Sequence, residues 1–246
     1  MANYGDMGRG GSPPAGGGFR YGPERSRFYA GAAVAIGNGS AHTVVRTDAK
    51  GALRSIGVVF TAGMLEGLPK AGAGENPDFP YLLPMPTTGP KTIIDHMVID
   101  WESEGHPPPK VYDVQHFDFH FYLMSYADQL QVTFNSPLDS ADPAQQPAPE
   151  FVPAGYVLPP GTAVPQMGVH AINPAAAEFQ QQPFTATFIY GYYNQQLTLY
   201  RADDVAGIPA IQAVLFGPRA AARCLRQARR LSLHLQRQLR HSQHAV

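Results

Sequence analysis

The stretch HFDFHFY at residues 116–122 decides the fold that we expect of this chain. Side chains of a β-strand alternate between the two faces of a sheet. In such a strand the three phenylalanines share one face, and the two histidines, the aspartate and the tyrosine share the other. An aromatic row is typical of a strand packed on a core. The His and Asp row needs polar partners if it is buried and only water if it faces solvent, and both arrangements are open.

Most of the remaining sequence indicates strands joined by turns. Glycine (25) and proline (24) together make about a fifth of the 246 residues, which argues against a helical bundle. Strands are expected at 28–36, 42–47, 54–61, 92–101, 111–126, 129–134, 166–172, 184–190 and 196–200, with hairpin turns at 48–51 and 127–128. We therefore predict a mainly β protein, a single antiparallel sandwich or barrel-like domain, with a C-terminal helix.

The two ends of the chain differ from its middle. Residues 1–27 are rich in glycine and proline with little to bury, and we expect a disordered head. The β-rich domain with the His and Asp residues is expected at 28–204, and a helical, Arg-rich tail at 205–246. Residues 1–218 hold 11 basic and 19 acidic groups, whereas residues 219–246 hold seven arginines and no acid. Nucleic acid is thus an unexpected partner except through the tail, whose basic residues attract polyanions.

Several classes of protein are excluded or disfavoured by motif and composition. No apolar run approaches the 18 or more residues of a membrane-spanning helix. The single cysteine, Cys224, allows no internal disulfide and no thiolate zinc cluster within one chain. The G-x-S-x-G, H-E-x-x-H and Walker A motifs are missing, so nucleophilic, zincin and P-loop chemistry are not supported. No secretory signal peptide is visible, which predicts a cytoplasmic protein by default.

Histidine and aspartate are left as the metal-competent residues. Neighbouring side chains on one face of a strand lie roughly 6.6 Å apart, so His116 and His120 are roughly 13 Å apart. They are not expected to share one ion, which suggests that Asp118 pairs with one of them. Two more histidines could complete a site: His106 precedes three prolines that stiffen its loop, and His170 ends a glycine-containing turn. That turn loosely resembles the second metal motif of cupins, but the first cupin motif is missing.

A wider likeness supports these candidates. The segment D-W-x-x-x-G-H-x-P at 100–108, followed by H-F-D-F-H-F-Y at 116–122, resembles the signature of a bacterial family of unknown function. Shorter likenesses at 36–39, 65–69, 167–170 and 187–191 extend the resemblance over roughly residues 28–200. It implies a β-rich domain, similar to proteins associated with zinc and with symmetric oligomers, so a homo-oligomer is expected. The positions that match the metal-motif residues are His106, His116, Asp118, His120 and His170.

One position departs from that family. After the last strand the family usually continues with a glutamate and then Pro-Met, where this chain has Arg201-Ala202-Asp203. If the glutamate is a ligand, a cationic arginine cannot replace it.

Three functional hypotheses follow. The first is an oligomeric protein whose bound zinc is mainly structural. The second is a cupin-like or hydrolytic metalloenzyme, in which an open coordination position activates water or oxygen. The third is a metal-free module that binds a small ligand against a polar lining of histidines.

Overall fold

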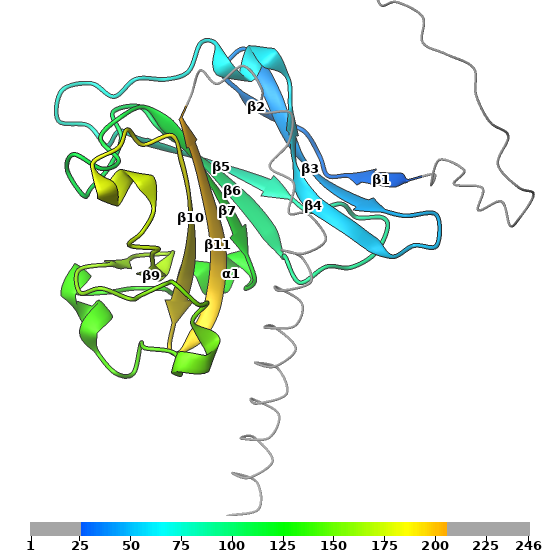
Figure 1. Ribbon diagram of the computed structural model, residues 1–246. Coiled ribbons are helices and arrows are strands. Elements are labelled where there is room, and N and C mark those ends of the chain that lie inside the picture. Colours follow the sequence, from blue (N-terminus) through cyan, green and yellow to red (C-terminus); the bar gives the residue numbers. More distant parts are fainter. Residues whose placement is uncertain (1–25, 206–246) are drawn as a thin grey trace, which may run out of the picture.

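The computed structural model describes residues 26–205 (Figure 1). Nearly all of the predicted disordered head lies outside the described residues, and so does nearly all of the segment at 205–246 that was predicted to be a helical, Arg-rich tail. Within the described range no helix has the length and apolar character needed to span a bilayer.

Strands dominate the described part of the chain, and the helical segments are single turns. The strands are β1 Arg27–Ala30, β2 Val34–Ile36, β3 Gly39–Thr47, β4 Leu53–Phe60, β5 Asp78–Pro84, β6 His96–Glu102, β7 His116–Tyr122, β8 Ala163–Val164, β9 Gly168–Ala171, β10 Ala186–Tyr193 and β11 Gln196–Val205. The helical turns are η1 Ala62–Leu65, α1 Tyr126–Gln129, η2 Pro137–Ala141, η3 Pro149–Phe151 and η4 Ala177–Gln180. The prediction of a mainly β, antiparallel protein is confirmed.

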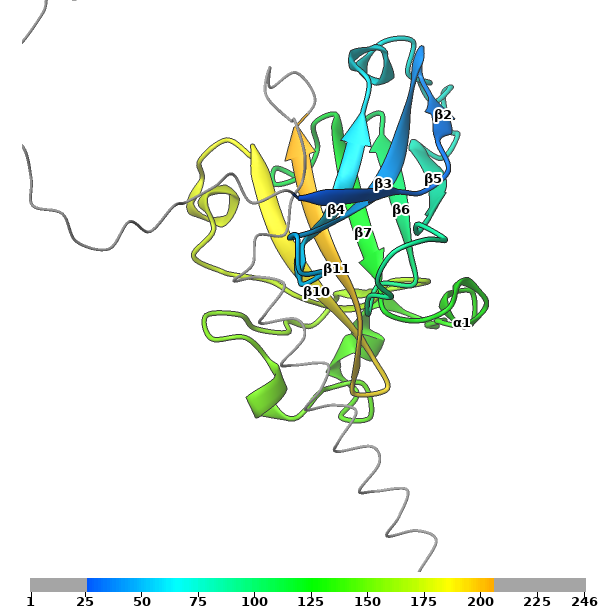
Figure 2. The same cartoon turned by 90° about the vertical axis from the view of Figure 1, so that its right-hand side faces the viewer.

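The strands form two sheets. In the smaller sheet β3 pairs with β1 and β2 and also with β4, so β3 is central. The larger sheet has seven strands in the order β5-β6-β7-β11-β10-β9-β8, and every pairing in it is antiparallel. This sheet is curled into half of a barrel, and the smaller sheet packs across its outer side (Figures 1 and 2). The strand bearing the HFDFHFY sequence, β7, lies inside the large sheet between β6 and β11.

The hydrophobic core fills the space between the two sheets. Phe117, Phe119 and Phe121 of β7 are fully buried there. They belong to the same cluster as Val45 and Ile56 of the small sheet. The aromatic face of the HFDFHFY strand is therefore its core face, as the alternation predicts.

The opposite face of the large sheet is covered by the segment between β7 and β10. This segment carries the short helical turns and the small strands β8 and β9, and it folds back against the curled sheet (Figure 1). Because β9 pairs with β10 and β8 pairs with β9, the segment also widens the sheet at one edge.

Three details of the predicted strands are wrong. The second hairpin does not form, because Ser125 accepts a hydrogen bond from the Asp128 amide and caps α1 at the expected turn. Residues 28–36 form two strands separated by a break at 31–33. The strand β5 lies between the strands expected at 54–61 and 92–101, where none was expected. It is an edge strand that pairs only with β6, and such strands tolerate proline.

Candidate metal centre

The polar face of β7 is buried rather than exposed to solvent. His116, Asp118 and His120 expose 0–1% of their surface. The solvent-exposed arrangement left open by the sequence is therefore wrong. The neighbouring strands add further ionisable groups to the same face, because Asp100 and Asp203 lie opposite Asp118 in the register on its two sides. Each of these groups needs a partner, and the partners decide what the site can do.

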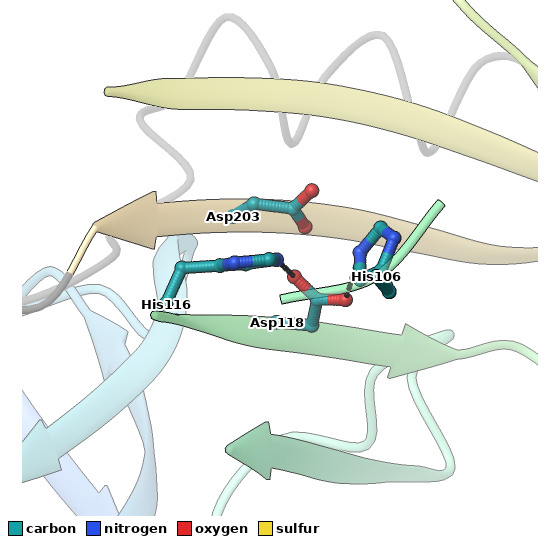
Figure 3. Close-up of side chains that lie close together, drawn as sticks. All are labelled: His106, His116, Asp118 and Asp203. Carbon is teal, nitrogen blue, oxygen red and sulfur yellow. Dashed lines mark ion pairs between the residues drawn. The ribbon is translucent and has the colours of Figure 1, made fainter. Parts of the chain in front are cut away.

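Four side chains converge above β7. His106, His116, Asp118 and Asp203 each offer one ligand atom, and these atoms all lie within 4.8 Å of one another (Figure 3). His116 Nε2 lies 3.1 Å from Asp118 Oδ1, and His106 Nε2 lies 3.2 Å from Asp118 Oδ2. His116 and Asp118 come from β7, Asp203 from β11, and His106 from the loop after β6. We call these four residues the His/Asp cluster.

Backbone carbonyls orient both imidazoles of the cluster. The Nδ1 atom of His116 lies 2.6 Å from the Val114 carbonyl, and that of His106 lies 2.7 Å from the Pro107 carbonyl. A carbonyl oxygen only accepts hydrogen bonds, so each Nδ1 carries the proton. In the neutral ring Nε2 then presents its lone pair, and in both residues Nε2 faces Asp118. Histidines that ligate metals are usually held in this way.

The loop that carries His106 is shaped by a glycine. Gly105 has a φ of +76°, and a Cβ at this position would collide with the backbone of Tyr112. The loop then folds back, and the amide of His106 donates a hydrogen bond to the carbonyl of Tyr112 at 3.1 Å. This turn brings the His106 ring to 4.9 Å from the ring of His116, measured between centroids.

Arg201 is the fifth participant, and the sequence did not predict its role. It lies on β11, two residues before Asp203, and is buried. Its Nε and Nη2 each lie 2.6 Å from an oxygen of Asp203, which gives a two-point ion pair. Nη2 also lies 2.7 Å from His106 Nε2 and 3.2 Å from Asp118 Oδ2. One guanidinium thus contacts three of the four members of the cluster.

Burial and charge move the pKa values of these groups in different directions. Burial alone would raise the pKa of Asp118, but Arg201 and the two histidines hold it well below its usual range. Burial lowers the pKa of His116, yet the contact with Asp118 outweighs this and raises it overall. Burial raises the pKa of Asp203 to about 7, with Arg201 opposing the shift and Asp118 adding to it. When two carboxylates share a site, their pKa values generally move apart in this manner.

Two predicted ligands lie outside the His/Asp cluster. His120, farther along β7, has its Nδ1 at 3.2 Å from Asp100 Oδ2. Burial lowers the pKa of His120 to about 3, so this ring is neutral. His170, on β9, is likewise buried with a pKa well below its usual range, again because of burial. Of the five predicted site residues, the structure brings together His106, His116 and Asp118.

The buried His96, on β6, connects parts of the fold rather than joining the cluster. Its two ring nitrogens lie 3.0 Å from Asp95 Oδ1 and 2.7 Å from Gln129 Oε1. Its ring stacks on Tyr122 at 4.8 Å between centroids. Both nitrogens are therefore engaged, and the residue ties β6 to α1.

A cavity of about 720 Å³ opens on one side of the His/Asp cluster. His106, Asp118, His170 and Arg201 are among its lining residues. Much of the remaining wall is apolar and comes from the proline-rich segment between β7 and β9, including Pro159 and Pro165. Mostly apolar cavities with a few polar groups at one end are typical small-molecule sites.

The donor atoms of the cluster fit a divalent ion. Two imidazole nitrogens and two carboxylate oxygens form a set that zinc accepts in tetrahedral sites. Three of the buried donor atoms, His116 Nε2 and both oxygens of Asp118, make ionic contacts but no aligned hydrogen bond among the described residues. A cation between them would satisfy all three.

Sequence reasoning missed Asp203 as a member of the cluster. The HFDFHFY motif is recognisable because His116, Asp118 and His120 alternate with aromatic residues on one strand. Asp203 is a single aspartate near the end of another strand, β11, and belongs to no such pattern. Its pairing opposite Asp118 depends on the register between β7 and β11, which no local pattern reveals.

Comparisons with known proteins add one finding. Residues 48–101 match the TTHB210-like family, whose description is "Hypothetical protein TTHB210". The matched region runs from the turn between β3 and β4 to near the end of β6, so it includes Asp100 and stops before His106. All four residues of the His/Asp cluster lie beyond it. Neither the curated proteins nor the solved structures gave a match.

Proposed function

We propose that this chain binds a divalent metal ion, zinc, through His106, His116, Asp118 and Asp203. One observation carries the proposal: both imidazoles donate their Nδ1 proton to a backbone carbonyl and turn Nε2 toward the same buried carboxylate. The two Nε2 atoms and the Asp118 carboxylate thus lie close enough together to be ligands of one ion. Zinc is one of the common divalent ions that bind imidazole nitrogen and carboxylate oxygen without thiolate ligands.

The proposed ion has a structural role. Its ligands come from the loop after β6, from β7 and from β11, so it joins segments that are far apart in the sequence. Metal binding that joins such segments contributes directly to the free energy of folding. Association into a homo-oligomer, with the ion stabilising the assembly, is a further part of this proposal.

Zinc titration of chelator-treated protein tests the proposal. Wild-type protein should bind one ion per chain, and His116→Gln should weaken binding at least tenfold. The chain has nine histidines, three of them outside the described residues, so a matched control is needed. His42→Gln removes a histidine from β3 in the other sheet and should leave the affinity unchanged. Equal zinc affinity of His116→Gln and His42→Gln would reject the proposal.

A size measurement tests the structural role of the ion. Elemental analysis of the purified protein, followed by sedimentation before and after chelation, should show stoichiometric zinc and a smaller species once it is removed. An unchanged size with the ion removed would leave zinc binding in place but would contradict its role in assembly.

The cavity favours a second candidate function, the binding of a small organic molecule with an apolar body. A metalloenzyme would use the same cavity, because the wall includes His106 and Asp118. Met167→Trp would narrow the cavity, since Met167 is one of its lining residues. If the cavity is a binding site, this variant should lose binding of a neutral apolar dye such as Nile red while its zinc affinity remains unchanged.

A further inference from the structure

Arg201 places a fixed positive charge among the proposed metal ligands. Its guanidinium contacts Asp203 at two points, and its Nη2 also contacts His106 and Asp118. The side chain is 4% exposed, so water does not screen this charge effectively. The cluster therefore already contains one cation that the protein itself supplies.

The contact with His106 determines whether the two cations are compatible. Nδ1 of His106 donates to the Pro107 carbonyl, so Nε2 has the only lone pair of the ring in its plane. That lone pair accepts the hydrogen bond from Arg201 Nη2 at 2.7 Å. A metal ion bound to His106 needs the same lone pair. The arginine and the metal ion cannot both hold His106 at the same time.

We propose that Arg201 and a divalent ion are alternative occupants of this buried anionic site, and that Arg201 sets the metal affinity of the chain. This inference rests on the proposed function. Electrostatic repulsion also disfavours simultaneous binding of the guanidinium and the ion, because both cations would contact Asp118 and Asp203. Metal binding thus requires Arg201 to withdraw from His106.

The fold offers space for that withdrawal. Arg201 is one of the residues that line the cavity of about 720 Å³ beside the cluster. The guanidinium can therefore leave His106 without displacing the packed core, which lies on the other face of the sheet. In the metal-free protein the same guanidinium compensates the two carboxylates that would otherwise be buried without a counter-charge.

Zinc affinities measured by competition with a chelator test the inference. Arg201→Gln removes the charge, and we expect its zinc dissociation constant to fall at least tenfold relative to wild type. Arg54→Gln is the matched control, because Arg54 also pairs with an aspartate, Asp48, but lies on β4 in the other sheet. Its affinity should equal that of wild type.

The possible outcomes separate the two proposals. If wild type binds zinc and Arg201→Gln binds no more tightly, the inference is overturned and the proposed function survives. If only Arg201→Gln binds zinc, the inference is supported and the proposed function of the natural chain fails. If neither binds, both fail.

A measurement on the wild-type protein covers the case in which Arg201→Gln does not fold. The Arg201 Nε–H group donates to Asp203 at 2.6 Å, so its side-chain ¹⁵N NMR signal should be protected from exchange with water in the metal-free protein. Arg201→Lys, which has no such group, assigns the signal. Saturating zinc should shift the signal or expose it to exchange, and an unchanged signal in the zinc-bound protein would overturn the inference.

Discussion

On one face of β7, Phe117, Phe119 and Phe121 pack between the two sheets; on the other face, His116, Asp118 and His120 lie under the cavity and the loops. Both rows are buried to the same extent, with exposures of 0–1%. The aromatic row needs only close packing, which many apolar residues can provide. The ionisable row needs particular partners at particular distances, because each unpaired group would be costly. The two faces of β7 are thus equally buried but differ in role: the aromatic face contributes to stability, and the ionisable face provides the groups of the site.

The largest expected effect is on the aromatic face. Phe119→Ala should lower the free energy of unfolding by about 4 kcal/mol, since it removes a fully buried ring and leaves a cavity. Urea unfolding of the metal-free protein measures this loss. The control Phe28→Ala removes a ring that is 67% exposed and should change stability by less than about 0.5 kcal/mol. Similar losses for both variants would show that the aromatic row is not the main source of stability.

An intermediate effect is expected on the ionisable face. Asp203→Asn should destabilise the metal-free protein by about 3 kcal/mol, because Arg201 loses its two-point partner while remaining buried. The same variant should also weaken zinc binding. Asp142→Asn, at an exposed position, is the control and should change neither property. If Asp203→Asn is as stable as wild type, the ion pair between Arg201 and Asp203 does not contribute to the free energy of unfolding.

The smallest effect concerns the pH dependence of stability. Burial, together with the charges of Asp78 and Asp118, raises the pKa of Glu102 to about 7 from an ordinary value near 4.5. The folded protein therefore binds this proton more tightly than the unfolded chain, and stability should fall as the pH rises from about 4.5 through 7. Glu102→Gln removes the penalty, so it should be more stable than wild type at pH 8 by about 2 kcal/mol and equal to it near pH 4.

Unfolding of metal-free wild type and Glu102→Gln at pH 4 and pH 8 measures this difference. Glu66→Gln, at an exposed glutamate, should follow the wild-type pH profile. A parallel profile for Glu102→Gln would show that Glu102 does not titrate differently in the folded and unfolded states.

Much of the fold was predictable because strand alternation is a local property. The hairpin formed by β3 and β4, the strand at 116–122 and the aromatic core face all follow from alternation and turn residues. The edge strand β5 was not predictable, because its prolines are tolerated only through its pairing on one side. The strand expected at 129–134 does not form, because the chain makes a capped helical turn where a hairpin turn was expected.

The site was predictable in part. His116, Asp118 and His120 share a strand face, so the sequence predicted that Asp118 pairs with one of the two histidines, and the stiff loop marked His106. The structure decided that the partner on this strand is His116. Whether the polar row is buried depends on the segment between β7 and β10, which has no regular pattern.

By itself, the sequence determined which side chains share a face of β7, because period-two alternation is a property of the backbone. It also excluded a thiolate cluster within one chain, because the sequence has a single cysteine. Only the tertiary structure decided that Asp203 and Arg201 join the cluster, because strand register brings β11 beside β7. It also decided that the polar face is buried, and a charge removed from bulk water must be matched by another charge nearby.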